Sequence, residues 1–183
     1  MISHYNKPLP KGLSYEGDIH YVEKVDFLYD LTYKKKDGKV ERDSEIFNRI
    51  FEAIENAEDF IVIDMFLFNS YVERDKGYPK LAETMTDKLI SKKTLNPDLN
   101  IVFITDPINT SYGSHMSKEI ELLKENDIEV VVTDLTRLRD PNPIYSSVWR
   151  TFFQWFGQEG KGWLPNPLAK TGPKVTLRSY LDL

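Results

Sequence analysis

The sequence predicts an α/β fold in which a mostly parallel sheet is flanked by helices. Three runs are continuously apolar: FIVIDMFLF (60–68), NIVFIT (100–105) and IEVVVT (128–133). The stretches between them carry apolar residues at helical spacing, which gives a strand–helix–strand–helix–strand order. That order is typical of parallel strands joined by right-handed crossovers. We expect all three strands to be buried, with 60–68 at the centre of a sheet that is covered on both faces.

An extended lead-in and a hairpin are expected before this core. Residues 1–20 form the lead-in, and residues 21–183 form a single α/β domain. The lead-in is rich in residues that interrupt regular structure: Pro8, Pro10, Gly12 and Gly17. Residues 24–41 carry Asp37-Gly38 between two strand-like stretches, which is a hairpin signal.

Helices are expected between the strands. The first begins at Asp43 or Ser44 as N-cap and carries an apolar face of Ile46, Phe47, Ile50, Phe51, Ile54 and Ala57. A second helix follows Pro79, over about residues 80–93. A third is capped by Ser114 and runs through Ile120 and Leu123.

Charge and composition exclude several classes of protein. The 183 residues carry a net charge of -5 and no Cys, so no disulfide or thiolate chemistry is expected. Residues 134–183 hold seven basic against four acidic residues, a balance of +3, and the rest of the chain is therefore at -8. A nucleic-acid partner is not expected, because phosphate neutralisation needs a basic face. The chain has no long apolar run or signal peptide and is expected to be soluble, with an undetermined cellular location.

The candidate ligand site lies where the predicted strands end. In parallel sheets, ligands gather beyond the carboxyl ends of the strands. Polar side chains follow two of these strands: Asn69, Asp106, Asn109 and Ser111. Asp106 opens DPINT, where Pro-Ile-Asn favours a turn, so its structural interpretation is preferred. Asp64 lies inside an apolar strand and, if buried there, needs a hydrogen-bonding or charged partner.

No complete catalytic set is visible in the sequence. The three histidines, His4, His20 and His115, have no recurrent acidic spacing, so no metal site is expected. No Gly-rich phosphate loop or nucleophile elbow is present either. We therefore expect no cofactor.

An aromatic amphipathic helix is predicted over NPIYSSVWRTFFQWFG (142–157). At 100° per residue, one half of this helix collects Ile144, Tyr145, Val148, Trp149, Phe152, Phe153, Trp155 and Phe156. Such a face suits a membrane interface, with Trp149, Phe152, Phe153 and Phe156 as the candidate contacts. It also suits burial against the sheet or against another part of the parent protein. Burial is the preferred interpretation, because it is more common and because Arg150 is the single basic residue on the polar face.

Several segments resemble the phospholipase D superfamily, and within it the bacterial phospholipase D-like proteins related to cardiolipin synthases. The resemblance is carried by IFNRIFEAIENAEDFIVIDMFLFN and ELLKENDIEVVVTDL, and at the start by KPLPKG and VDFLYDLTY. It covers nearly the whole chain from Lys7 onward. It implies a phosphodiesterase or phosphatidyltransferase that acts on phospholipids through a phosphohistidine, without a metal.

The signature of that family, His-x-Lys-x4-Asp, is absent here. The residues two places after His4, His20 and His115 are Asn6, Val22 and Ser117, none of which is Lys. No catalytic residue can therefore be assigned, and the resemblance implies a chain that is inactive alone.

Five of the last ten residues, KVTLRSYLDL, are apolar or aromatic and no closing turn follows, whereas termini are usually polar. We expect the chain to stop just before the first signature, as the first half of a two-half protein whose C-terminal half is its partner. An unfinished sheet would expose an edge strand or an apolar patch, with residues 174–183 as the expected place, and favour a homodimer there. Two alternatives remain: a stand-alone α/β module that binds a small ligand, and a membrane-surface domain acting through residues 144–156.

Overall fold

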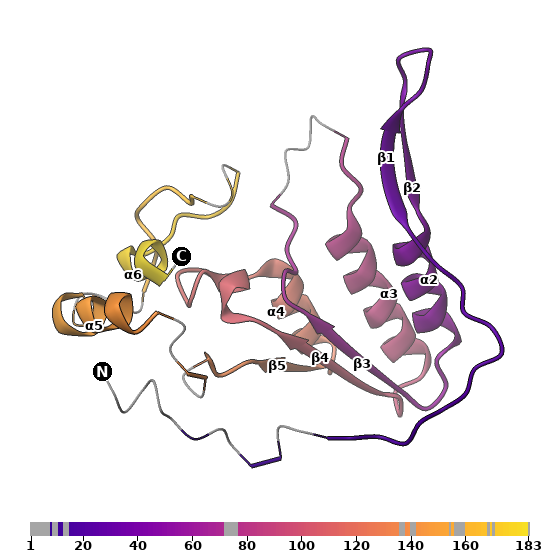
Figure 1. The fold of residues 1–183 in the computed structure, drawn as a ribbon, viewed down its shortest axis with the longest axis horizontal. Helices are drawn as coiled ribbons and strands as arrows, with labels where there is room; N and C mark the ends of the chain where they lie inside the picture. The colour runs from indigo at the N-terminus through magenta and orange to yellow at the C-terminus, as the bar shows by residue number, and fades with distance from the viewer. Residues whose placement is uncertain are drawn as a thin grey trace.

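The computed structural model confirms an α/β fold (Figure 1). A two-stranded antiparallel hairpin precedes a three-stranded parallel sheet, and two further helices follow the sheet. The residues that the structure describes are 8, 11–12, 15–71, 77–135, 138–139, 142–153, 155, 160–167, 169 and 171–182.

The hairpin forms where the sequence predicted it. Strand β1 (Asp30–Lys34) pairs antiparallel with β2 (Val40–Ser44). Gly38 takes a φ of 87°, which few other residues tolerate, and the Asp37 carboxylate accepts a hydrogen bond of 3.0 Å from the Lys39 amide. The hairpin projects from the body of the chain (Figure 1).

The three apolar runs form one parallel sheet, as predicted, but their order differs from the expectation. Strand β4 (Asn100–Thr105) is central, between β3 (Phe60–Met65) and β5 (Glu129–Val132). The register pairs Ile63 with Phe103, and Phe103 with Val130. The prediction that the first run is the central strand is therefore wrong, because β3 lies at an edge.

Three helices cover one face of this sheet: α2 (Glu45–Asn56), α3 (Leu81–Leu95) and α4 (Lys118–Glu125). Between them and the sheet lies a buried cluster that includes Ile54, Phe68, Met85, Leu89, Leu99, Ile101, Phe103, Ile120, Leu123 and Ile128. The first two helices match the prediction closely. The third begins later than predicted, with Ser117 rather than Ser114 at its N-cap position.

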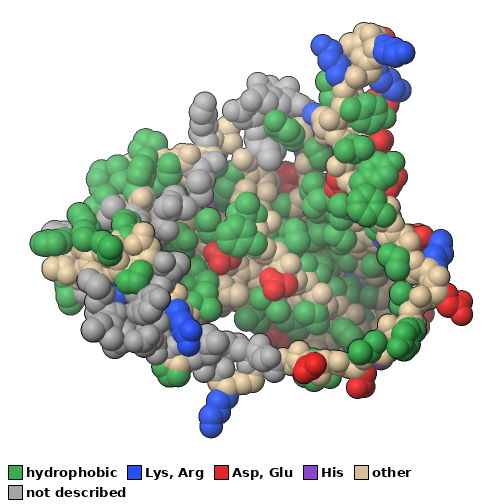
Figure 2. Space-filling model, viewed as in Figure 1, with side chains coloured by type: hydrophobic (Ala, Val, Ile, Leu, Met, Phe, Trp, Pro, Cys, Tyr) green, Lys and Arg blue, Asp and Glu red, His purple; other side chains and the backbone are tan. Residues whose placement is uncertain are grey.

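The opposite face of the sheet is open, so the prediction of two covered faces is wrong. This open sheet face carries four apolar side chains that are exposed to solvent: Phe60, Val62, Phe66 and Val131. Phe60 is the most exposed of them, at 65%. Asp64 is also exposed on it and needs no buried partner. Here each new strand is added to the sheet in the same direction. Because the crossovers also have the same hand, the connecting helices all lie on one side of the sheet. The space-filling view shows a hollow whose base is made of hydrophobic side chains with some acidic side chains among them (Figure 2).

The C-terminal part of the chain contains two helices and a short bridge between them. Helix α5 (Pro143–Phe152) lies within the predicted 142–157, part of which falls outside the described residues, and none of its described residues is fully buried, so burial of this helix against the sheet is not seen. Leu164 and Val175 form an antiparallel bridge. Helix α6 (Leu177–Asp182) lies where an exposed edge strand was one of two expectations, so the expectation of a strand there is wrong.

Candidate functional site

The loop after β4 is tied to the end of β3 by one buried side chain, Asn109. Its Oδ1 accepts a hydrogen bond of 2.7 Å from the Phe68 amide, and its Nδ2 donates to the Phe66 carbonyl at 2.8 Å and to Thr105 Oγ1 at 2.8 Å. Nδ2 also lies 3.2 Å from the carbonyl of Asp106. Asn109 is 1% exposed, so these contacts use its polar atoms within the fold.

The other predicted ligand residues lie nearby and are also engaged. Asp106 caps a short 3-10 helix, η2 (Pro107–Thr110), by accepting a hydrogen bond of 2.9 Å from the Ile108 amide, which confirms its structural interpretation. Asn69 Oδ1 accepts one of 3.2 Å from the Tyr71 amide. Ser111 is buried and takes a positive φ of 46°. The four residues meet at the carboxyl end of the sheet as predicted, mainly to hold its loops together.

His115 is the residue at this end that sequence reasoning missed. Its Nδ1 lies 3.1 Å from the carbonyl oxygen of Met116, and its Nε2 lies 3.2 Å from Ser111 Oγ. When Nδ1 carries the proton, it donates a hydrogen bond to the Met116 carbonyl, and Nε2 then accepts a hydrogen bond from the Ser111 hydroxyl. The Tyr71 hydroxyl lies 3.4 Å from Nδ1, and the two rings meet edge to face. Only the i, i+4 spacing of Ser111 and His115 could have suggested this cluster.

The Ser111–His115 pair does not assemble a serine hydrolase site. Such a site needs backbone N–H groups that are available to a developing oxyanion. The amides of residues 111–115 all donate within the loop, for example Ser111 to the Ile108 carbonyl and Tyr112 to that of Pro107. The geometry therefore gives no support for acyl transfer, and both ring nitrogens of His115 are engaged within the loop.

A buried carboxylate supports the same loop. Glu119 is 2% exposed, and it accepts hydrogen bonds from the hydroxyl of Ser70 and, at 3.4 Å, from that of Ser117. The pKa of Tyr71 is raised above its ordinary value, first because burial disfavours the phenolate and then because of the negative charge of Glu119.

This raised pKa gives a testable pH dependence. The folded chain holds the Tyr71 proton more tightly than the unfolded chain, whose phenol titrates near 10.0. The stability that Tyr71 contributes is therefore complete below pH 10.0 and is lost as the pH rises toward the folded pKa. An ultraviolet titration of the wild type minus that of Tyr71→Phe should isolate one phenol with a midpoint above 10.0, and Glu119→Gln should lower that midpoint. A midpoint at or below 10.0 would contradict the assignment.

The C-terminal part of the chain is clasped to this loop by Ser114. The Thr176 amide donates to Ser114 Oγ at 2.9 Å, and the two hydroxyl oxygens also lie 2.9 Å apart. The Gly162 amide donates to the Ser114 carbonyl at 3.1 Å. Ser114, predicted as a helix cap, is instead the buried link between the sheet and residues 160–176.

The clasp forms a pocket of about 580 Å3, called here the carboxyl-end pocket. It is lined by Gly113, Ser114, His115, Met116, Gly160, Lys161, Gly162, Pro173 and Lys174. Among the residues that the structure describes, this lining holds two ammonium groups and an imidazole and no carboxylate. Lys161 and Lys174 are exposed, and neither forms an ion pair within the described part of the chain. The arrangement favours an anionic ligand.

The candidate membrane residues lie on or next to α5. Phe152 and Phe153 are exposed, and Trp149 is half-buried. Phe156 lies outside the described residues. Helices α5 and α6 lie on the same side of the molecule (Figure 1). An aromatic face that is open to solvent is thus available at this end of the chain.

Searches of the described residues found no group of three metal-ligating side chains. They also found no helix with the length and apolar character needed to cross a bilayer. Comparison with protein-family models, with curated proteins and with solved structures gave no match to the chain.

Proposed function

We propose that this chain is the N-terminal part of a phospholipase D-like phosphodiesterase or phosphatidyltransferase, and that its carboxyl-end pocket binds the phosphate of a phospholipid. The observation that carries the proposal is the pocket lined by Lys161, Lys174 and His115, whose described residues include no carboxylate. The sequence resemblance supports the same class of ligand. Because the chain contains no His-x-Lys-x4-Asp signature, the proposed role of this chain alone is binding without turnover.

The chemistry of the pocket suits a phosphate group. An ammonium group offers three donors and a compact positive charge, so two lysines can satisfy several phosphate oxygens at once. The imidazole of His115 is fixed by Ser111 and by the Met116 carbonyl, so it forms a rigid wall of the pocket and the lysines supply the donors. Gly160 and Gly162 carry no side chains to hinder a ligand close to the backbone.

Helix α5 supports a lipid rather than a soluble phosphate as the ligand source. Its exposed aromatic side chains suit the headgroup region of a bilayer, where such rings are favourable. In the proposal, α5 lies against the membrane surface and the carboxyl-end pocket receives a headgroup. A soluble phosphate-bearing ligand, as expected of a stand-alone binding module, uses the same pocket without needing α5.

Co-sedimentation with lipid vesicles tests the proposal. We expect binding to phosphatidylglycerol vesicles, and Lys161→Ala/Lys174→Ala should weaken it about thirtyfold, since each lysine near an anionic surface contributes about 1 kcal/mol. Lys36→Ala/Lys39→Ala removes the same charge from the hairpin and should have a much smaller effect. Equal losses in the two double variants would show general charge attraction and contradict a pocket.

Further measurements separate the remaining possibilities. Phe152→Ser/Phe153→Ser should abolish vesicle binding and leave binding of a soluble glycerophosphodiester unchanged if the source is a lipid. If soluble binding persists and vesicles are never bound, the small-ligand module is correct. The chain alone should not hydrolyse phosphatidylglycerol or an aryl phosphodiester, and hydrolysis that a point change in this chain abolishes would overturn the proposal.

A further inference from the structure

The segment before the hairpin, residues 19–29, has the pattern of a β-strand and is called here the arm. Its odd positions are apolar or aromatic apart from one acid: Ile19, Tyr21, Glu23, Val25, Phe27 and Tyr29. The even positions are polar at His20, Lys24 and Asp26 and apolar at Val22 and Leu28, so the alternation is partial and favours a strand with one more apolar face. In the structure the arm has a bend at Glu23, no helix, and no strand partner among the described residues.

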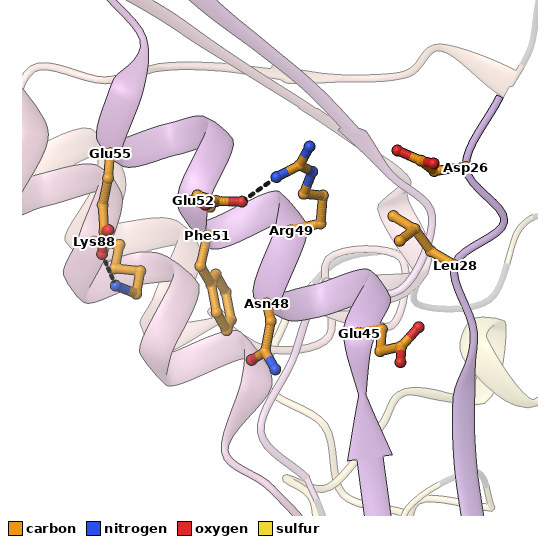
Figure 3. A pocket seen from close by; sticks show the side chains of 9 residues that line it. All are labelled: Asp26, Leu28, Glu45, Asn48, Arg49, Phe51, Glu52, Glu55 and Lys88. Atoms are coloured by element: carbon orange, nitrogen blue, oxygen red, sulfur yellow. Dashed lines mark hydrogen bonds and ion pairs between the residues drawn. The ribbon is translucent and has the colours of Figure 1, made fainter. Parts of the chain in front are cut away.

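The arm leaves its odd-numbered face unburied. Tyr21, Val25 and Phe27 are 97%, 82% and 87% exposed. The even-numbered Asp26 and Leu28 point instead toward α2, across a hollow of about 800 Å3 (Figure 3). That hollow is lined largely by charged groups, among them the ion pair of Arg49 with Glu52. The arm therefore gains little apolar burial from its own chain.

The same chain offers a surface that this face fits. Within the described residues, β3 has β4 as its only strand partner, so one row of its backbone N–H and C=O groups has no strand beside it. Phe60, Val62 and Phe66 lie exposed next to that row, on the open sheet face. A strand added along β3 would form hydrogen bonds with the free backbone groups of β3. Its apolar side chains would then extend the apolar surface of the open sheet face.

We propose that the arm of one chain adds to β3 of a second copy, and that the two copies exchange arms around a twofold axis. An extended segment of 11 residues exposes about 2,000 Å2, of which docking on one side buries about half. That is comparable with the roughly 800 Å2 per partner of a stable interface, and the exchange provides the contact twice. The donor strand and the acceptor edge both belong to this sequence, so a second copy is the occupant that the chain supplies.

Sedimentation equilibrium tests the exchange. We expect a dimer, and Val25→Asp/Phe27→Asp should raise its Kd at least about tenfold, because two apolar side chains lose their burial. Val62→Asp on the acceptor face should do the same. Leu95→Asp, which adds a charge at an exposed apolar residue on α3, should leave the Kd unchanged.

A mixture of the two kinds of variant gives a sharper result. The arm variant keeps an intact acceptor and the Val62→Asp variant keeps an intact arm, so together they can form one of the two contacts. We expect the mixture to associate more strongly than either variant alone. Three results would each overturn the proposal. The wild type could be a monomer, the arm and Val62 substitutions could leave the Kd of the dimer unchanged, or the mixture could associate no more strongly than either variant alone.

Discussion

Gly162→Ala is expected to destabilise the C-terminal part of the chain and to abolish the carboxyl-end pocket. A Cβ at this position would lie 2.0 Å from the Lys174 carbonyl oxygen and 2.6 Å from the Val175 amide nitrogen. Backbone atoms cannot move aside as a flexible side chain can, so the two segments must separate. Separation breaks the bond from the Gly162 amide to the Ser114 carbonyl and the pairing of Leu164 with Val175.

The expected cost is about 3 kcal/mol, the upper part of the usual range for a core clash. For a chain of this length that corresponds to a fall in Tm of about 6–12 °C. Thermal unfolding measures it, and phosphatidylglycerol binding should be lost well below the new Tm. Gly17→Ala is the matched control, because its new Cβ meets only the flexible ring of Tyr15, at 3.4 Å. Equal stability of the two variants would contradict the close approach described at Gly162.

Asn109→Ala is expected to loosen the carboxyl ends of β3 and β4. The substitution leaves the Phe68 amide and the Phe66 carbonyl without their partner in a buried place, and it removes the donor to the Thr105 hydroxyl, which keeps its bond to the Met65 carbonyl. A buried polar group that loses its partner costs about 1–3 kcal/mol, so we expect a loss of about 3–5 kcal/mol in the free energy of unfolding. Denaturant unfolding measures this loss.

Amide hydrogen exchange locates the effect of the same substitution. The Phe68 amide should exchange much faster in Asn109→Ala than in the wild type, because its acceptor is gone. Asn100→Ala removes the same side chain from an exposed position at the start of β4 and should change stability by less than about 0.5 kcal/mol. If Phe68 remains protected in Asn109→Ala, the tie between the two strands is not the one described.

Elements with a strong local pattern could be predicted from the sequence. The hairpin at Asp37-Gly38 depends on adjacent residues, and α2 depends on an apolar stripe with the helical period. The side of the sheet on which each helix lies is not a local property. It depends on the direction in which strands are added, and the apolar run of β3 is equally compatible with a central strand and with an edge strand that has one open face.

The sequence predicted where the candidate site lies, but it predicted only some of the residues that form it. The carboxyl ends of the strands were the expected location, and Asn69, Asp106, Asn109 and Ser111 do meet there. The cationic residues Lys161 and Lys174 come from a segment about fifty residues downstream and reach the site through the clasp at Ser114. A contact of that kind leaves no periodic signal in a single sequence, because it depends on tertiary packing.

The order of the parallel strands has a consequence for how the chain acquires its structure. Each strand of the parallel sheet pairs with its neighbour in sequence, so each connection that must close spans one α-helix and its turns, with the short helix η2 also present between β4 and β5. Short closures cost little entropy and favour rapid assembly. During synthesis, β3 and α3 leave the ribosome before β4, and α4 leaves it before β5. The sheet can therefore grow one strand at a time without long-range rearrangement.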